Sequence, residues 1–341
     1  MVPFRRHTAI AHAAYHDLVS LLLDEAVSEI KGAPTLRERD GRRYWYDRYR
    51  IGDQIAERYL GEDADALRQR IETHESLREN RDAGRKERAR LVRLLRGEGF
   101  LGMDNATGSL IHALSKAGLF RLGGTLVGTN AFRAYEGELG IRLKLDQLAM
   151  TNDIDIASFE KLSLAIGDTT LPSVDETLKG FEFDPVPSTE PGQVWRWRQS
   201  RSKTLVEFLT PSFEEDEGLK PLSALGVSAQ SLHYLNYLIS APIPSAAIYR
   251  DGALIQIPRP ERFAIHKLIV SDRRRDGTNS LKSRKDLQQA QLLIAVLAED
   301  RPTDLKEAYE HALAVGPQWR KRIERALDRA PRAADLINSV L

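Results

Sequence analysis

The chain has 341 residues, of which 42% are hydrophobic, so it is long enough for two domains or one elaborated domain and can bury a sizeable core. Its 50 lysines and arginines nearly balance its 49 aspartates and glutamates, and the net charge of +1 argues against a uniformly basic nucleic-acid-binding surface. The absence of cysteine excludes disulfides, thiolate zinc sites and cysteine nucleophiles.

The first hundred residues are predicted to be mainly helical and charged. They begin without the apolar core of a signal peptide, and no apolar run in the chain is long enough to span a bilayer, so we expect a cytoplasmic protein with no membrane partner. Apolar residues recur at helical spacing across 12–30, and 64–95 reads as charged helix. Residues 42–50 combine arginine with aromatic side chains. Such a run can stack on RNA bases or pack a helical hairpin onto the next domain, and we favour packing.

A strand, a small-residue turn and a helix follow. The expected elements are a helix at 109–117, a strand at 120–127 and a helix at 130–139. The turn is Gly128-Thr129, at the start of the second helix, where backbone amides can cradle a phosphate. A plain turn with Thr129 as helix N-cap is the alternative, and the two interpretations are compatible.

Two aspartates, Asp153 and Asp155, lie on the next predicted strand, residues 153–157. Because side chains alternate along a strand, both project to one face while Ile154 and Ile156 project to the other. Two carboxylates on one face repel each other unless a cation lies between them, and the usual cation is a hard divalent metal such as Mg²⁺. A solvent-facing edge strand is the alternative. The glycine turn before this strand and a later acid favour metal ligation.

That later acid is Glu207, alone in an apolar strand predicted over 203–209. A buried acid without a partner is costly, so we expect it to face a cation or a polar cleft. It is a candidate third metal ligand, or the base that takes the proton of an attacking hydroxyl. The alternative is an ion pair with Arg196 or Arg198 on a neighbouring strand.

The last third of the chain is predicted to be a hairpin followed by helices. The expected elements are a hairpin at 246–257 around a two-residue turn, Asp251-Gly252, and helices at 262–270, 281–297, 304–314 and 317–327. In the first helix, Lys267 is either a surface lysine or a contact to a triphosphate, and His266 is expected to be a packed helix histidine. Residues 284–286 are expected to form an exposed charged cluster.

The glycine turn, the acid-x-acid strand and the single later acid together resemble the DNA polymerase β-like nucleotidyltransferase superfamily. Four segments are similar to one bacterial branch of it, a family of uncharacterised predicted nucleotidyltransferases. They are LVGTNAF at 126–132, TNDIDI at 151–156, VEFLTP at 206–211, and PERFAIHKLIV at 260–270 followed by Lys285-Asp286-Leu287. The resemblance covers roughly residues 94–297.

The resemblance implies an α+β fold, with a mixed-sheet nucleotidyltransferase core between helical N- and C-terminal extensions. We place the N-terminal region at 1–100, the core at 101–258 and the C-terminal region at 259–341. It also implies an NTP donor such as ATP, and Mg²⁺, with Mn²⁺ as the alternative. The implied catalytic metal ligands are Asp153, Asp155 and Glu207, and the implied nucleotide-binding residues are Gly128, Thr129 and Lys267.

The acceptor stays open, because RNA, a protein and a small molecule all fit. Two other interpretations stay open as well. One is a toxin or defence protein that modifies tRNA or a protein. The other is a degenerate, non-catalytic module that binds nucleotide or RNA. The non-catalytic interpretation is suggested by the third acid, which is aspartate in most members of the superfamily but glutamate, Glu207, in this chain.

Overall fold

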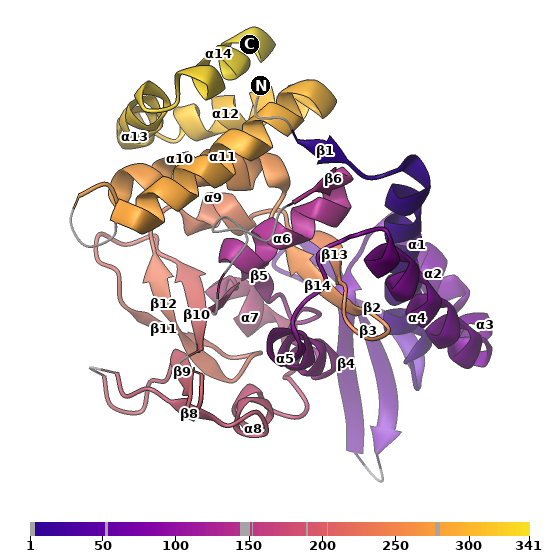
Figure 1. Cartoon of the computed structure of the whole chain (residues 1–341). Helices are drawn as coiled ribbons and strands as arrows, with labels where there is room; N and C mark the ends of the chain where they lie inside the picture. Colours follow the sequence, from indigo (N-terminus) through magenta and orange to yellow (C-terminus); the bar gives the residue numbers. More distant parts are fainter. Residues whose placement is uncertain are drawn as a thin grey trace.

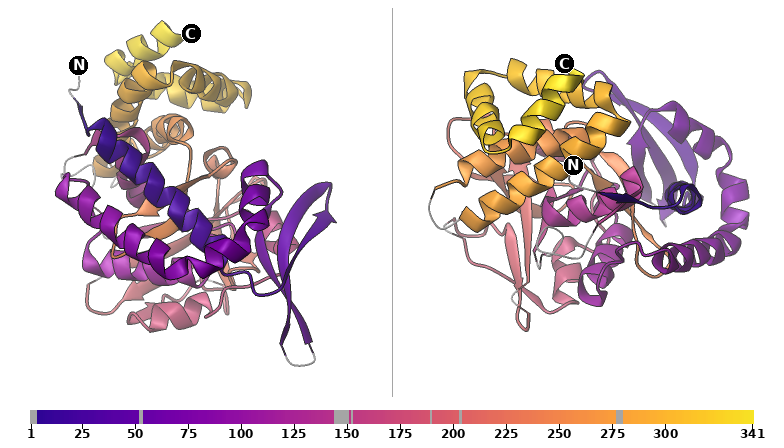
Figure 2. Two further views of the ribbon diagram at one scale, coloured as in Figure 1. Left: turned by 90° about the vertical axis from the view of Figure 1, so that its right-hand side faces the viewer. Right: turned by 45° about the horizontal axis from the view of Figure 1, so that its top comes forward.

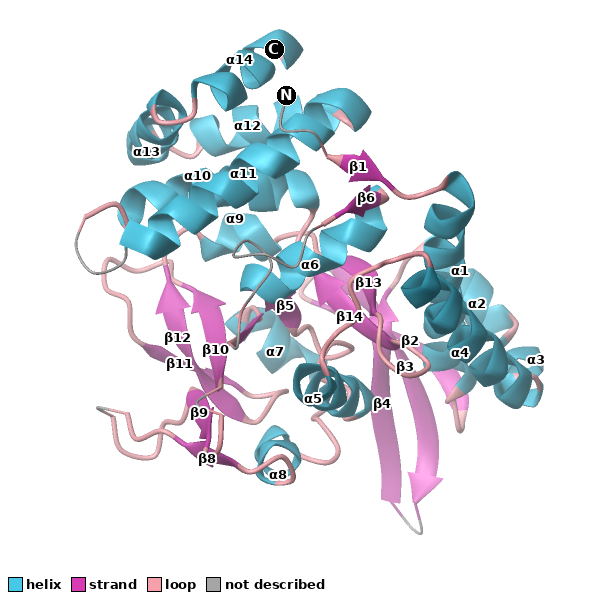
Figure 3. Ribbon diagram, in the orientation of Figure 1, coloured by secondary structure: helices cyan, strands magenta, loops and turns pink. Residues whose placement is uncertain are grey.

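A computed structural model describes residues 4–51, 54–143, 151, 153–188, 190–202, 204–276 and 280–341. These residues form an α+β fold in which helices surround a central mixed sheet, and this confirms the predicted fold class (Figures 1 and 3). Within the described residues, no helix combines the length and apolarity needed to cross a membrane. The predicted domain boundaries stay a prediction.

The central sheet is built from seven strands: β5 (Thr125–Val127), β7 (Ile154–Ala157), β8 (Phe183–Pro185), β9 (Arg196–Gln199), β10 (Leu205–Pro211), β11 (Leu219–Leu222) and β12 (Val227–Leu232). Its order is β11-β12-β10-β7-β5, and β9 joins β10 to β8. The pairs β7–β10 and β10–β12 are parallel, whereas β5 runs antiparallel to β7. The parallel arrangement places the beginnings of β7 and β10, where the acids lie, side by side.

Helix α5 (Asn105–Lys116) precedes this sheet and α9 (Leu235–Ile239) follows it, and between its strands lie α6 (Gly128–Leu139), α7 (Glu160–Ile166) and α8 (Val174–Lys179). The predicted helix at 130–139 is confirmed as α6, and Gly140 ends it in the left-handed conformation, with φ of 61°. Helix α6 packs against β5 and β7. The predicted hairpin is confirmed as β13 (Ile243–Ala247) and β14 (Ala253–Ile257). The prediction of a two-residue turn is wrong, because Ala247 pairs with Ala253 and residues 248–252 form the connection.

The N-terminal region contains β1 (Arg5–Arg6), which pairs with β6 (Ile141–Arg142), and the helices α1 (Ala9–Ser28), α2 (Asp65–Glu72), α3 (His74–Glu79) and α4 (Arg81–Gly97). Between α1 and α2, however, the prediction of helix is wrong. This stretch forms an antiparallel sheet of β2 (Ala33–Arg39), β3 (Arg42–Ile51) and β4 (Gln54–Glu62). In Figure 2 this sheet projects from the side of the molecule.

The aromatic run in β3 explains why this stretch becomes a sheet. Tyr44 and Tyr46 are two residues apart, so a strand directs both into the core, where Tyr59 of β4 meets them. The Tyr46 hydroxyl donates a hydrogen bond of 2.9 Å to the carbonyl of Ile166. The favoured interpretation, packing onto the neighbouring region, is therefore confirmed, but by strands instead of a helical hairpin.

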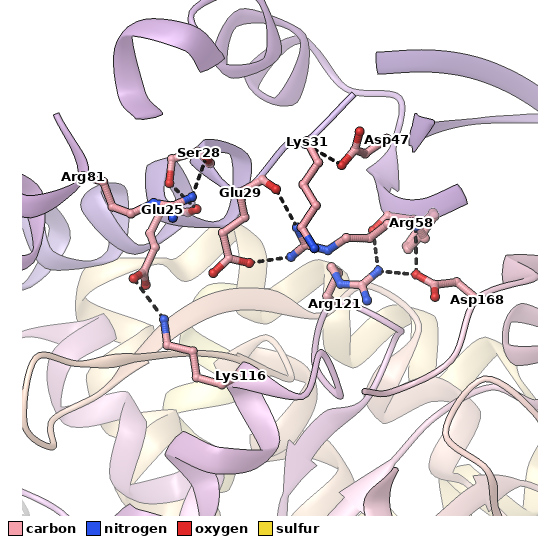
Figure 4. A network of polar contacts seen from close by, with 11 residues as sticks. Glu25, Ser28, Glu29, Lys31, Asp47, Arg58, Arg81, Lys116, Arg121 and Asp168 are labelled. Atoms are coloured by element: carbon pink, nitrogen blue, oxygen red, sulfur yellow. Dashed lines mark hydrogen bonds and ion pairs between the residues drawn. The ribbon is translucent and has the colours of Figure 1, made fainter. Parts of the chain in front are cut away.

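A polar network fastens the N-terminal region to the core (Figure 4). The Arg121 guanidinium donates to Asp168 over 2.6 Å and to the carbonyl of Tyr59 over 2.5 Å, and the Tyr59 amide donates to Asp168 over 2.9 Å. Nearby, Lys116 of α5 pairs with Glu25 of α1 over 2.9 Å. Because the Arg121–Asp168 pair is largely buried, either partner alone would leave an uncompensated charge.

We therefore expect Arg121→Ala to lower the free energy of unfolding by about 3 kcal/mol, the usual cost of breaking a buried ion pair. The matched control is Lys179→Ala, which breaks the exposed Lys179–Asp175 pair and should cost only about 0–1 kcal/mol. Urea unfolding of both variants makes the comparison. Equal losses in the two variants would show that Arg121 does not anchor the N-terminal region.

The C-terminal region consists of α10 (Pro260–Arg273), α11 (Ser280–Asp300), α12 (Pro302–Ala314), α13 (Pro317–Asp328) and α14 (Pro331–Val340). The four predicted helices are confirmed, and α14 was not predicted. Helix α10 packs on α11, α12 and α13, and its Phe263 lies 5.1 Å from the ring of Tyr135 in α6. Helix α10 thus reaches the core beside the helix that starts at Gly128.

Candidate active site

Asp155 and Glu207 lie next to each other on the two parallel strands β7 and β10. They are direct partners in the strand register, so their side chains leave the sheet on the same face. The apolar neighbours Ile154, Val206 and Phe208 are fully buried on the other face. The fold thus brings Glu207 beside Asp155, although the two acids are about fifty residues apart in the chain.

Gly128 supplies the third element of the site, because it touches Asp155 directly. Its φ is +66°, and a Cβ atom placed on it would lie 2.2 Å from Oδ2 of Asp155. Only glycine combines this conformation with such a close approach. Helix α6 starts at Gly128, with Val127 as its N-cap, so the alternative interpretation of Thr129 as N-cap is wrong. Thr129 is instead the second residue of the helix and is half-buried.

Asn130, the next residue of α6, holds the start of β7. Its side-chain amide donates a hydrogen bond of 2.8 Å to the backbone carbonyl of Asp153. The Asp153 amide donates to the hydroxyl of Thr151 over 3.1 Å. The hydrogen bond from Asn130 connects the backbone of Asp153 to the beginning of α6. The glycine turn and the strand that carries the aspartates are therefore held together locally.

The three carboxylates act on one another electrostatically. Burial raises the pKa of Asp155 to about 6, and the charges of Glu207 and Asp153 add to this rise. Burial also raises the pKa of Glu207; Arg196 opposes this rise and Asp153 adds to it. The three carboxylates offer only oxygen donors, and a divalent cation bound among them would relieve their mutual repulsion. In the described part of the chain, no three His, Asp or Glu side chains stand together as a ready-made metal site. Metal binding by Asp153, Asp155 and Glu207 stays a prediction.

Glu207 also has the partner that the alternative interpretation named. Arg196 is its direct neighbour on the antiparallel strand β9, and Nη1 of Arg196 lies 3.6 Å from Oε1 of Glu207. Arg198 is opposite Leu205 and is not that partner. Glu207 therefore forms this ion pair and also lies beside Asp155. Arg196 partly compensates its charge.

Lys267 is not a surface lysine. It is 7% exposed, and its ammonium lies 2.5 Å from Oδ1 of Asp286 on α11. Oδ2 of the same carboxylate pairs with Arg274 over 2.8 Å. The expectation of an exposed cluster at 284–286 is therefore wrong for Asp286, which is 3% exposed. His266 is buried, as expected for a packed helix histidine.

Sequence reasoning overlooked the cations that accompany Lys267. The positive charges of Lys267 and Arg274 both offset part of the pKa rise at Asp155. The available signal was their spacing of seven residues, two helical turns, which places both on one face of a helix. Burial lowers the pKa of Lys285, and the charge of Lys267 adds to that effect, whereas Asp286 and, less strongly, Asp153 oppose it.

The mixed sheet, the glycine turn against Asp155 and the acid-bearing parallel strands together define the class, an α+β nucleotidyltransferase core. A family model described as "Nucleotidyltransferase" matches residues 105–314, which include every site residue named above. The chain belongs to this nucleotidyltransferase family. A second family model, described as a domain of unknown function, matches residues 13–69, from α1 through the N-terminal sheet into α2. No curated protein and no solved structure matched the chain.

Proposed function

We propose that this protein transfers the NMP group of an NTP, such as ATP, to a hydroxyl or similar nucleophile of an acceptor. We also propose that it belongs to the DNA polymerase β-like superfamily. The observation that supports this most directly is the register pairing of Asp155 with Glu207, beside a glycine that carries the start of α6. In the reaction, the acceptor oxygen bonds to the α-phosphorus, the bond from that phosphorus to the bridging oxygen breaks, and pyrophosphate leaves.

Asp153, Asp155 and Glu207 are the residues that would hold Mg²⁺ or Mn²⁺. The bound metal would supply charge neutralisation at the phosphate oxygens and would lower the pKa of the attacking hydroxyl. Glu207 either joins as third ligand or accepts the proton of that hydroxyl. The raised pKa of Asp155 supports this assignment, because a cation would remove the repulsion that contributes to the rise.

The first turn of α6 and the cations of α10 would bind the triphosphate. The backbone amides at the start of α6 point away from the helix and attract phosphate oxygens, and the hydroxyl of Thr129 lies in the same turn. Lys267 would neutralise the phosphates from the opposite side. In this arrangement the protein mainly positions the reactants and stabilises charge, which is how phosphoryl-transfer enzymes reduce the barrier.

The direct test is incubation with NTPs labelled at the α-phosphate, with Mg²⁺, in the presence of bulk tRNA, cell lysate or neither. We expect a labelled acceptor that disappears when EDTA removes the metal. Labelled tRNA or labelled protein would favour the defence-protein interpretation of the same chemistry. NTP binding without transfer to any acceptor would favour the non-catalytic module. No binding of any NTP would overturn the proposed function.

The hydroxyl of Thr129 offers a test of the proposal that the first turn of α6 binds the triphosphate. We expect Mg²⁺ and NTP to bind cooperatively, and Thr129→Ala to weaken NTP binding several-fold, because one such bond contributes about 0.5–1.5 kcal/mol. Calorimetric titration of NTP with and without Mg²⁺ measures both effects. The matched control is Thr303→Ala, since Thr303 is also the second residue of a helix, α12. Equal affinity in the two proteins would remove Thr129 from the nucleotide site.

A further inference from the structure

Helix α4 carries a dense positive charge on its exposed side. It contains seven arginines and lysines and two acids, a net charge of +5, whereas the whole chain has a net charge of +1. Lys86, Arg90 and Arg93 recur at spacings of four and three residues, so they share one face of the helix. All three are exposed, and so are Arg85 and Arg96. The charge of α4 is therefore concentrated on its outward side.

The opposite side of α4 is already covered. Leu91, Val92 and Leu95 are at most 3% exposed and pack with residues of α1 in one hydrophobic cluster. The left view of Figure 2 shows the two helices side by side at the front of the molecule, α4 in purple and α1 in indigo. The buried apolar residues of α4 are thus used for packing inside the protein, and a partner on the outward side would mainly meet charges.

Intramolecular acids neutralise only part of the charge on this outward side. Glu87 pairs with Arg90 over 2.6 Å, and Asp251 pairs with Arg85 over 3.5 Å. Three cations of α4 form no ion pair with any residue that the structure describes: Lys86, Arg93 and Arg96. These three side chains are available to an anionic partner.

A second group of cations continues this surface past the end of α4. Arg5 of β1 and Arg142 of β6 are exposed and are direct partners in the antiparallel register. Like charges directly opposite each other destabilise a strand pair, and an anion between them would relieve the repulsion. Nη2 of Arg142 donates to the carbonyl of Glu98, the C-cap of α4, over 3.1 Å. We call the five cations together the basic track: Lys86, Arg93, Arg96, Arg142 and Arg5.

Helix α6 connects the basic track to the candidate active site. Arg142 follows the end of α6, and Gly128 at the start of α6 touches Asp155. The twelve residues of α6 span about 18 Å, and the ten residues from Lys86 to Arg96 span about 15 Å of α4. A partner that reaches both the track and the acids must therefore carry negative charges at regular intervals over a long distance. A polynucleotide does so, whereas a small acceptor does not.

We propose that the basic track binds the phosphate backbone of a nucleic-acid strand, and that this strand is the acceptor of the transfer. The role as acceptor rests on the proposed function. Exposed arginine and lysine side chains bind phosphates without reading sequence, so the track would hold the strand while its terminal hydroxyl reaches the acids. The hydroxyl oxygen then bonds to the α-phosphorus of the NTP, pyrophosphate leaves, and the hydroxyl proton passes to Glu207 or to water.

The first measurement is strand binding without NTP or metal. The probes are a fluorescent single-stranded RNA of about 20 nucleotides and the DNA of the same sequence, and anisotropy is recorded at several salt concentrations. The track variant combines Lys86→Gln, Arg93→Gln and Arg96→Gln, which removes three charges and keeps good helix formers. Each phosphate contact to a single strand contributes about 0.7 to the slope of log affinity against log salt concentration, so the slope should fall by about 2. Affinity should fall at least about tenfold.

The matched control combines Arg320→Gln, Lys321→Gln and Arg325→Gln, three exposed cations of α13. It also removes two arginines and one lysine, but from another helix, and it should keep the wild-type affinity and slope. Both triple variants should keep the wild-type NTP affinity in calorimetry, because α6 separates the track from Gly128. In transfer assays, the track variant should raise the KM for the strand and leave kcat nearly unchanged.

Each outcome decides the proposal. Binding of RNA, DNA or both, with a reduced slope in the track variant alone, supports it and identifies the kind of strand. Equal losses in the track variant and the control overturn it, and so does a wild type that binds neither strand. Track-dependent binding of vesicles that contain phosphatidylserine, with no binding of either strand, also overturns it.

The two parts of the proposal, and the proposed function, fail in different ways. Strand binding with no effect of the track variant on the KM for the strand overturns the role of the strand as acceptor. Wild-type protein that binds Mg²⁺–NTP but neither strand shows that the failure belongs to the basic track and not to the proposed function. Strand binding by a protein that binds no NTP shows the reverse.

Discussion

Replacing Asp155 with asparagine is expected to abolish transfer and, at the same time, to stabilise the metal-free protein at neutral pH. Loss of a metal ligand removes several kcal/mol of charge stabilisation in the transition state, which corresponds to a fall in rate of at least about a thousandfold. The variant also removes a carboxylate that is costly to ionise, because burial, Glu207 and Asp153 raise its pKa to about 6.

The sign of the stability change follows from the pKa of Asp155. An acid whose pKa is higher in the folded than in the unfolded protein loses stability as pH rises from about 4 to about 6. Asp155→Asn should therefore gain about 1–3 kcal/mol above pH 6 and nothing at pH 4 or below. Thermal unfolding across this pH range, with transfer assays, checks both effects. Mg²⁺ should raise the Tm of the wild type only.

The control for Asp155→Asn is Asp184→Asn, an exposed aspartate on β8 of the same sheet. It should change neither Tm nor activity appreciably. Full transfer activity in Asp155→Asn would show that Asp155 is not a metal ligand. Destabilisation of that variant at neutral pH would show that the carboxylate is compensated in the folded protein.

Gly128→Ala is expected to have the second largest effect. A Cβ atom at this position would lie 2.2 Å from Oδ2 of Asp155, so the carboxylate must move. The left-handed conformation adds about 1–2 kcal/mol of backbone strain. Because misplacing a catalytic group by about 1 Å can reduce the rate about a hundredfold, we expect a loss of that order in kcat/KM.

Gly226→Ala separates strain from displacement. Gly226 has a φ of +65°, nearly the same as Gly128, but its Cβ would meet nothing within 4 Å. This control should lose about 1–2 kcal/mol in urea unfolding and keep its activity. Similar activity in the two variants would mean that contact between Gly128 and Asp155 does not matter for the reaction.

Local patterns in the sequence were sufficient for the elements that carry the site. Alternation along a strand predicted that Asp155 projects away from the face of Ile154 and Ile156, and the spacing of apolar residues predicted α6 and the first four helices of the C-terminal region. Both depend only on neighbours within a few residues. The same reasoning failed for residues 33–62, because charged residues on both sides of the aromatic run resemble an exposed helix. The burial of Tyr44 and Tyr46 against the core favours strands over a helix in this stretch.

By itself, the sequence determined which residues carry the candidate chemistry and the helix or strand on which most of them lie. The tertiary structure decided which partners they take. The sequence offered Arg196 and Arg198 as possible partners of Glu207 without choosing between them, and it did not indicate that Glu207 pairs in register with Asp155, because strand register depends on contacts between distant segments. Nor does the sequence near Lys267 show that its partner is Asp286. Helices α10 and α11 must pack first, since only their packing buries that carboxylate between Lys267 and Arg274 and makes the pairing favourable.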